Sequence, residues 1–180
     1  MGTEKEVLQF WFEELTPEQW FKKDETLDDT IKERFSATLL AVAHGETYEW
    51  RTTIAGRLAE IIVLDQFSRN IYRGLPESFA YDGQALILAQ EALKDPQLNQ
   101  LTTPQRSFLY MPFMHSESPM MHKIARELFT EPGMENNLEF EEKHWAIIEK
   151  FGRYPHRNQI LGRISTPAEI AFLQEPNSSF

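Results

Sequence analysis

The apolar residues of this chain recur at intervals of three and four positions, and no segment shows a sustained two-residue alternation. The clearest stripes are Leu27, Ile31, Phe35, Leu39 and Val42; Ile54, Leu58, Ile61 and Ile62; Phe79, Leu86, Ile87, Ala89 and Leu93; and Phe140, His144, Ile147, Ile148 and Phe151. This period places the apolar side chains on one face of an α-helix, whereas a half-buried strand needs strict alternation. The spacing therefore predicts an all-α protein.

Helix starts are marked by a hydroxyl residue followed by proline, in Thr16-Pro17, Thr103-Pro104, Ser118-Pro119 and Thr166-Pro167. The hydroxyl accepts a hydrogen bond from a free backbone N–H, and a proline at the first helical position has no N–H to leave unpaired. Gly45 and Gly152 follow the first and last stripes, where a left-handed helix end is expected. Short helices with brief connections favour antiparallel α-hairpins.

No linker rich in Gly, Pro and Ser divides the 180 residues, so we expect one helical domain over residues 1–174 and a frayed tail over residues 175–180.

The absence of Cys excludes disulfides and thiolate chemistry. Neither a signal peptide nor an apolar run of the roughly 20 residues that a membrane span requires is present, so a cytoplasmic location without membrane contact is expected. The net charge of −10 argues against nucleic acid as a partner.

One stretch carries a positive net charge, although the chain as a whole is acidic. Residues 150–168 hold four Lys or Arg residues and one His, without a single Asp or Glu. Within it, the segment FGRYPHRN is a turn punctuated by Gly152 and Pro155. An Arg side chain presents a planar fork suited to carboxylate or phosphate, and Asn adds a donor and an acceptor. The turn therefore predicts an anion-facing site, unless its cations reach acids elsewhere on the surface. The candidate side chains are Arg153, His156, Arg157 and Asn158.

A second polar run, DQFSRN, follows the stripe that begins at Ile54. Asp65 and Arg69 are four residues apart and share one helix face, where an exposed pair contributes only about 0.2–0.5 kcal/mol. A buried pair would have to be fully hydrogen-bonded, because an unpartnered buried charge is costly. The run is thus either a structural ion pair between helices or part of a ligand site. Its further candidates are Gln66, Asn70 and Arg73.

A third polar run, HSE, holds His115 and Glu117 between two expected helices. A His beside a carboxylate can act as an oriented general base. The alternative is that both residues only complement helix ends, as a cation at a C-terminus and an anion before an N-terminus. His115, Glu117 and His156 are therefore the candidate catalytic residues.

The sequence carries no cofactor or metal fingerprint. There is no GxSxG elbow, no phosphate loop, no GxGxxG and no HExxH pair, so neither a cofactor nor a metal is expected. His144 lies on an apolar stripe, where a core residue with one satisfied nitrogen is the ordinary interpretation.

Together these runs resemble a bacterial family known as domain-of-unknown-function family 924. The similarity passes through VLQFWFEE, RLAEIIVLDQFSRNIYRG, FAYD, FLYMPFMHSE, FGRYPHRN and ILGR, and departs at Ser68, where the family pattern has proline. The resemblance implies a right-handed array of α-hairpins related to tetratricopeptide repeats, with no biochemical role that transfers. The positions that match its motifs are Asp65, Gln66, Arg69, Asn70, Arg73, Asp82, His115, Ser116, Glu117, Arg153, His156, Arg157 and Asn158.

Three functions are compatible with this pattern. The first is a pocket for a small carboxylate or phosphate ligand, with hydrolase-like acid–base chemistry. The second is a non-catalytic tetratricopeptide-like module that binds acidic peptide C-termini. The third is a buried polar network that only fixes helix packing. The sequence decides neither between them nor on enzymatic activity or oligomeric state.

Overall fold

The computed structural model describes residues 1–180 as α-helices joined by short 3₁₀ and π-helical turns, without a β-strand. The all-α prediction is confirmed. The helices are α1 (Glu4–Gln9), α2 (Pro17–Phe21), α3 (Glu25–Ala43), α4 (Ile54–Ile61), α5 (Ser68–Ile71), α6 (Asp82–Ala92), α7 (Thr103–His115), α8 (Pro119–Leu128), α9 (Glu135–Phe151) and α10 (Pro167–Phe172). None of them is both long and apolar enough to traverse a bilayer.

Most helix ends lie where the sequence predicts them. Thr166 caps α10, and its hydroxyl accepts a hydrogen bond from the N–H of Glu169. Gly152 ends α9 with a φ of 71°, in the left-handed region that favours glycine. The start of α7 differs from the prediction. Its cap is Thr102 rather than Thr103, so Pro104 takes the second helical position.

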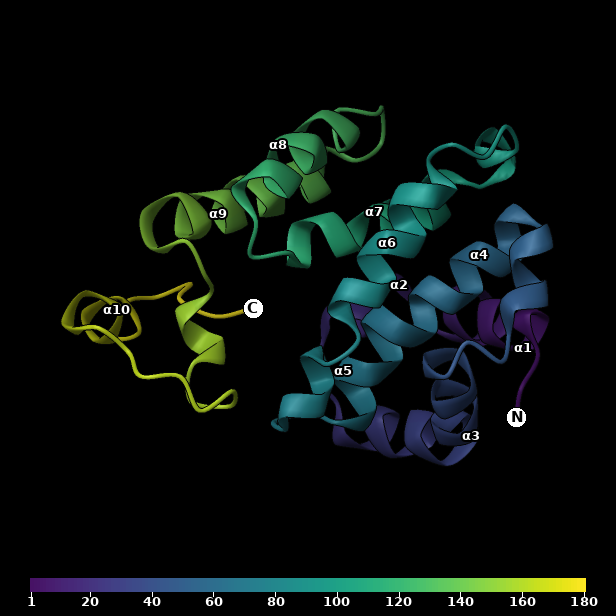
Figure 1. Ribbon diagram of the computed structural model, residues 1–180, viewed down its shortest axis with the longest axis horizontal. Helices are drawn as coiled ribbons and strands as arrows, with labels where there is room; N and C mark the ends of the chain where they lie inside the picture. The colour runs from purple at the N-terminus through teal and green to yellow at the C-terminus, as the bar shows by residue number, and fades with distance from the viewer.

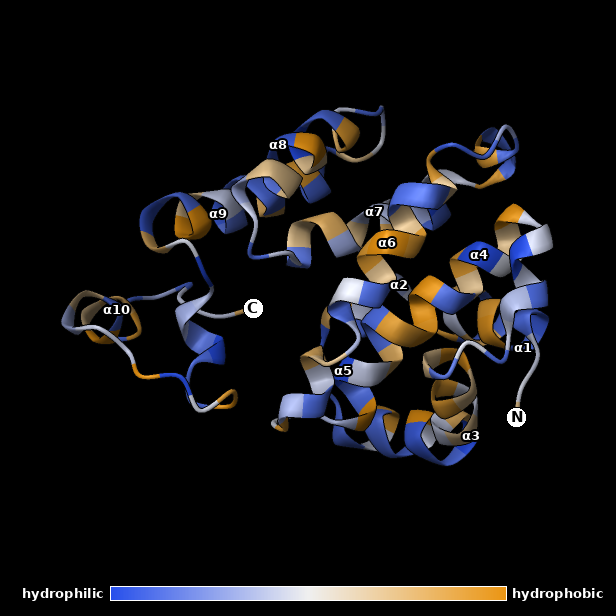
Figure 2. Ribbon diagram, in the orientation of Figure 1, coloured by the Kyte–Doolittle hydropathy of each residue, from blue (hydrophilic) through white to orange (hydrophobic).

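From α6 onward the helices pack against their neighbours in sequence, whereas the first half of the chain also pairs helices that are further apart (Figure 1). Helix α4 lies against α1 and α6, α6 against α7, α7 against α8, and α8 against α9, while α3 covers α5. Their apolar faces enclose one core of 32 buried residues, and Figure 2 shows long hydrophobic stretches on α3, α4 and α6. Aromatic rings fill the centre of this core. Phe35 and Phe67 lie 4.7 Å apart between ring centroids.

The residues after α9 form an arm outside this core (Figure 1). A separate small cluster of Ile147, Ile148 and Tyr154 connects the arm to α9. The arm contains the 3₁₀ turn η6 (Pro155–Arg157) and helix α10. It therefore carries the basic residues of the FGRYPHRN turn back toward α6 and α7.

Helix α4 continues into α5 through the π-helical turn η3 (Ile62–Phe67). Here the N–H of Ser68 bonds to the carbonyl of Val63, five residues back, instead of four. Such wide turns occur often at functional sites, because they change which side chains share a helix face. In this chain the turn holds Asp65 fully buried, on the side that faces α7.

Candidate functional site

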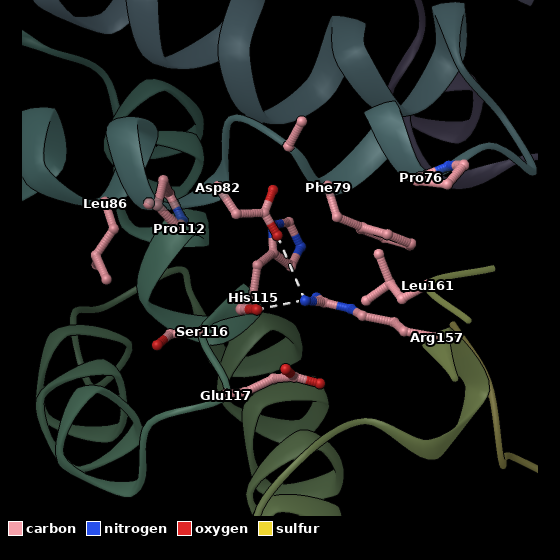
Figure 3. Close-up of a pocket in the computed structure, with 12 residues that line it drawn as sticks. Pro76, Phe79, Asp82, Leu86, Pro112, His115, Ser116, Glu117, Arg157 and Leu161 are labelled. Carbon is pink, nitrogen blue, oxygen red and sulfur yellow. Dashed lines mark hydrogen bonds and ion pairs between the residues drawn. The ribbon is translucent and has the colours of Figure 1, made fainter. Parts of the chain in front are cut away.

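A cavity of about 310 Å³ opens between α6, the end of α7 and the arm after α9 (Figure 3). Its volume lies at the small end of the range for ligand pockets. The wall is part apolar and part charged, as ligand sites commonly are. It is lined by Pro76, Phe79, Ala80, Asp82, Gly83, Leu86, Pro112, His115, Ser116, Glu117, Arg157 and Leu161.

The first polar feature of this pocket is a carboxylate–imidazole pair. Asp65 from η3 lies 2.6 Å from Nδ1 of His115, the last residue of α7. The second carboxylate oxygen of Asp65 accepts a bond of 2.7 Å from the side-chain amide of Gln66. Nε2 of His115 makes no hydrogen bond to the protein. This arrangement directs the imidazole and leaves one nitrogen available to a ligand.

The pKa shifts of the pair describe a base that is neutral near pH 7. Burial alone raises the pKa of Asp65, but the charges of His115 and Arg69 and two hydrogen bonds lower it to about 2. Burial lowers the pKa of His115 below its usual value, although the Asp65 carboxylate acts in the opposite direction. Asp65 is thus ionised and accepts the proton of Nδ1. Nε2 then has a free lone pair, as a general base requires.

Asp82, at the start of α6, and Arg69 form a two-bond ion pair beside this imidazole. The two guanidinium nitrogens of Arg69 donate to the two Asp82 oxygens at 2.8 and 2.9 Å. The expected pair with Asp65, four residues back, is longer, at 3.4 Å between side chains. Arg69 also donates to the backbone carbonyl of Asp65 at 2.8 Å. It therefore connects η3 to α6 and has little capacity left for a ligand.

Of the three guanidinium groups around the cavity, that of Arg157 from the arm makes the fewest hydrogen bonds. It donates to the carbonyl of His115 at 2.9 Å and to Asp82 at 3.4 Å (Figure 3). Its carbon Cζ lies 4.6 Å from the ring centroids of both Phe79 and Tyr154. A guanidinium has five N–H groups, so three have no protein acceptor: the buried one on Nε and one on each terminal nitrogen. Burial, and then the charge of Arg69, lower the pKa of Arg157, which still remains a cation.

Glu117 also lines the cavity, but protein donors already bind both oxygens of its carboxylate. Its carboxylate accepts two bonds from Arg163, at 2.7 and 2.9 Å, and one of 2.8 Å from the N–H of Tyr154. Burial raises the pKa of Glu117, and these bonds more than reverse the effect and lower it. Glu117 is thus an ionised anchor for the arm. It contributes no free proton donor to the pocket.

Two candidates of the DQFSRN run lie on another surface. Asn70 and Arg73 both bind the carboxylate of Asp28 on α3, at 2.8 Å from each. Neither residue lines the pocket around His115. They connect α5 and the residues after it to α3. This is the structural role, a polar contact between helices, that was one of the two interpretations of the DQFSRN run.

The remaining candidates lie within the arm. Arg153 forms a two-bond pair with Glu169 of α10, at 2.7 and 2.8 Å, and the side chain of Asn158 donates to Ser165 at 3.0 Å. His156 packs beside Tyr154 with Nδ1 buried and without a partner. Burial lowers the pKa of His156 to about 4. These side chains hold the arm together and do not line the pocket.

The charges around the cavity balance. Asp65, Asp82 and Glu117 supply three carboxylates, and Arg69, Arg157 and Arg163 supply three guanidinium groups. With His115 neutral, the site carries no surplus cation. The strongly positive pocket that the sequence suggested is therefore reduced to one guanidinium, that of Arg157, which still has free donors.

The family model described as "Bacterial protein of unknown function (DUF924)" matches residues 7–177. The chain belongs to this family. A solved structure of a protein of unknown function from Agrobacterium tumefaciens is 34% identical, with a TM-score of 0.90 over 95% of this chain and 96% of that chain. No curated protein matches the chain. The resemblance drawn from the motifs of DUF924 is thus confirmed, and it brings no reaction with it.

Several residues that build the site of this DUF924 member have no distinct signal in the sequence. Asp82 appeared only as a match to the FAYD motif, although it bridges Arg69 and Arg157. Tyr154 lies within FGRYPHRN but was not selected. His122 of α8 carries no local signal, because it sits among apolar residues of an ordinary helix. Only its position in space connects it to the end of α7.

Proposed function

We propose that this pocket binds a small organic acid and that His115 acts on it as a general base. The observation that carries the proposal is the Asp65–His115 pair next to Arg157, in one cavity of about 310 Å³. Arg157 offers unused N–H donors to a carboxylate or phosphate oxygen. The apolar wall formed by Phe79, Leu86 and neighbouring residues suits an aliphatic part of the same ligand.

The charge balance indicates how such a ligand is bound. Adding an anion to a neutral site leaves one uncompensated negative charge, unless His115 takes up a proton. A weak acid that transfers its proton to Nε2 and leaves its anion at Arg157 keeps the site neutral. In the hydrolase-like form of the proposal, Nε2 takes a proton from a water whose oxygen attacks an ester, amide or phosphate. The bond to the leaving group then breaks, and the imidazolium returns the proton to the departing alcohol or amine.

The first test is a calorimetric titration with isobutyrate and inorganic phosphate as probes. Arg157→Gln is expected to weaken isobutyrate binding about tenfold or more, because a charge-assisted bond is lost. Arg73→Gln is the matched control, since Arg73 is bound to Asp28 and lies outside the pocket. The control should bind as the wild type does, and affinity should rise as the pH falls toward the pKa of His115. Equal losses in the two variants, or no binding by the wild type, would end the proposal.

Turnover is tested with the same protein on ester, amide and phosphate substrates. Any activity should disappear in His115→Ala and persist in His156→Ala, because His156 does not line the pocket.

A tetratricopeptide-like peptide module remains the competing function. The arginines that it would offer to a peptide carboxylate, Arg73 and Arg153, are bound to Asp28 and Glu169. Tight binding of an acidic C-terminal peptide without binding of isobutyrate would favour that module.

A further inference from the structure

The C-terminal end of α7, which carries His115, is held by side chains from elsewhere in the chain. The last carbonyls of a helix have no partner within it. Here three consecutive carbonyls each accept a side-chain bond. Tyr154 donates to Met114 at 2.5 Å, Arg157 to His115 at 2.9 Å, and His122 to Ser116 at 2.7 Å. The position of the proposed base therefore depends on residues of α8 and of the arm.

Of these three donors, His122 has the most constrained surroundings. It is fully buried, and its Nδ1 lies 2.7 Å from a carboxyl oxygen of Glu141 on α9. Glu141 is also fully buried, and its other oxygen has no hydrogen-bond partner. The side chain of His122 thus connects the α8–α9 hairpin to the carbonyl of Ser116, the residue after His115.

The bonding partners determine the protonation of this pair. The carbonyl of Ser116 can only accept, so Nε2 of His122 must carry a proton. Nδ1 then either donates to an ionised Glu141 or accepts from a protonated one. The pair is neutral in both states, which is how two titratable groups can be buried together. Burial raises the pKa of Glu141, in agreement with a shared proton.

We propose that His122 and Glu141 are positioning residues for His115. This inference rests on the proposed function, in which His115 is the base. Glu141 keeps the N–H of His122 directed at the Ser116 carbonyl, and that bond holds the residue that follows His115 at the end of α7. Ser116 itself lines the cavity. The molecule therefore holds two carboxyl–imidazole pairs in series, one that carries the reaction and one that orients the first.

A stability role alone explains this arrangement poorly. A buried polar pair contributes little net stability, since the cost of removing both groups from water offsets their attraction. The unpartnered oxygen of Glu141 adds to that cost. What the pair supplies, and an apolar side chain of the same size does not, is a donor with a fixed direction at Ser116.

Two substitutions of His122 separate its two contacts. In His122→Asn the amide replaces Nδ1, so the contact with Glu141 is kept and the donor to Ser116 is lost. In His122→Gln the longer side chain places its amide near Nε2, so the donor to Ser116 is kept and the contact with Glu141 is lost. Arg126→Ala is the control, because it removes an exposed ion pair with Glu142 across the same two helices.

The readouts are the pKa and ring-nitrogen shifts of His115 by NMR, together with isobutyrate affinity. In His122→Asn the pKa of His115 should rise toward its ordinary value, and isobutyrate binding should weaken about tenfold, as expected when a binding group is displaced. His122→Gln keeps a donor for Ser116 but loses the direction that Glu141 gives it, so it should change both quantities less than His122→Asn does. Arg126→Ala should leave both quantities close to those of the wild type. If His122→Asn does not fold, Glu141→Leu should move the pKa of His115 and Glu141→Gln should not.

Equal effects of the two His122 substitutions, or of the two Glu141 substitutions, would overturn the inference and leave a structural role. An unchanged His115 pKa in His122→Asn would do the same. The NMR readout needs no ligand. A wild type that does not bind isobutyrate therefore defeats the proposed function, while the His115 shifts still decide whether His122 positions it.

Discussion

The two histidines selected from the sequence motifs, His115 and His156, have different surroundings. His115 is held by an ionised carboxylate and lines the cavity. His156 lies beside the rings of Tyr154 and Phe180, and its buried Nδ1 has no partner. A pattern of neighbours along the chain cannot separate these cases, because the partner of His115 lies 50 residues away. We therefore expect the first to affect ligand binding and the second to affect stability.

At the residue scale, His156→Phe should reduce the loss of stability in acid. Burial lowers the pKa of His156 to about 4, whereas the unfolded chain has the ordinary value of about 6.5. Between these values the unfolded state binds a proton that the folded state does not. The stability present above about pH 6.5 is thus lost progressively as the pH falls to about 4.

The measurement is the thermal midpoint of wild type and His156→Phe at about pH 7.5 and about pH 5. The difference between the two pH values should be smaller in the variant, while isobutyrate affinity stays unchanged. An identical acid sensitivity of both proteins would contradict this account of His156.

At the scale of elements, the sequence predicted what depends on local spacing. The stripe from Leu27 to Val42 lies in α3, and that from Phe140 to Phe151 lies in α9, whose first five residues precede it. The π-helical turn at residues 62–67 was not predicted, because intervals of three and four apolar residues do not distinguish it from an α-helix. This turn places Asp65 toward α7 and makes its contact with Arg69 secondary to that with His115.

Gly56 of α4 shows how one residue sets the distance between two elements. An added Cβ there would lie 1.9 Å from the carbonyl oxygen of Trp50, in the 3₁₀ turn η2 (Tyr48–Thr52). Gly56→Ala should therefore cost about 2 kcal/mol or more of unfolding free energy, despite the better helix propensity of alanine. Gly83 of α6 has no atom within 4 Å of such a Cβ.

Chemical denaturation of the two glycine variants measures this difference. Gly83→Ala should leave stability unchanged or raise it by about 0.4–1 kcal/mol, because alanine lowers the entropy of the unfolded chain. A Gly56→Ala protein as stable as Gly83→Ala would contradict the close approach of the Trp50 carbonyl to Gly56.

At the scale of the whole molecule, the site exists only because distant segments meet. The arm brings Arg157 to the carbonyl of His115, 42 residues earlier in the chain, and Glu117 binds Arg163, 46 residues later. The sequence showed that the FGRYPHRN turn is basic, but not which acid each cation reaches. Arg73 forms an ion pair with Asp28, and Arg153 forms one with Glu169. These carboxylates compensate most of the positive charge that the sequence suggested for a ligand site.

The most direct measurement of the central claim is a crystal structure of the protein soaked with isobutyrate. The account predicts a carboxylate bonded to the Arg157 guanidinium, within hydrogen-bond reach of His115 Nε2, with the aliphatic part toward Phe79 and Leu86. Density for the acid only at the surface around Asn70 and Arg73, with an empty cavity beside His115, would contradict it.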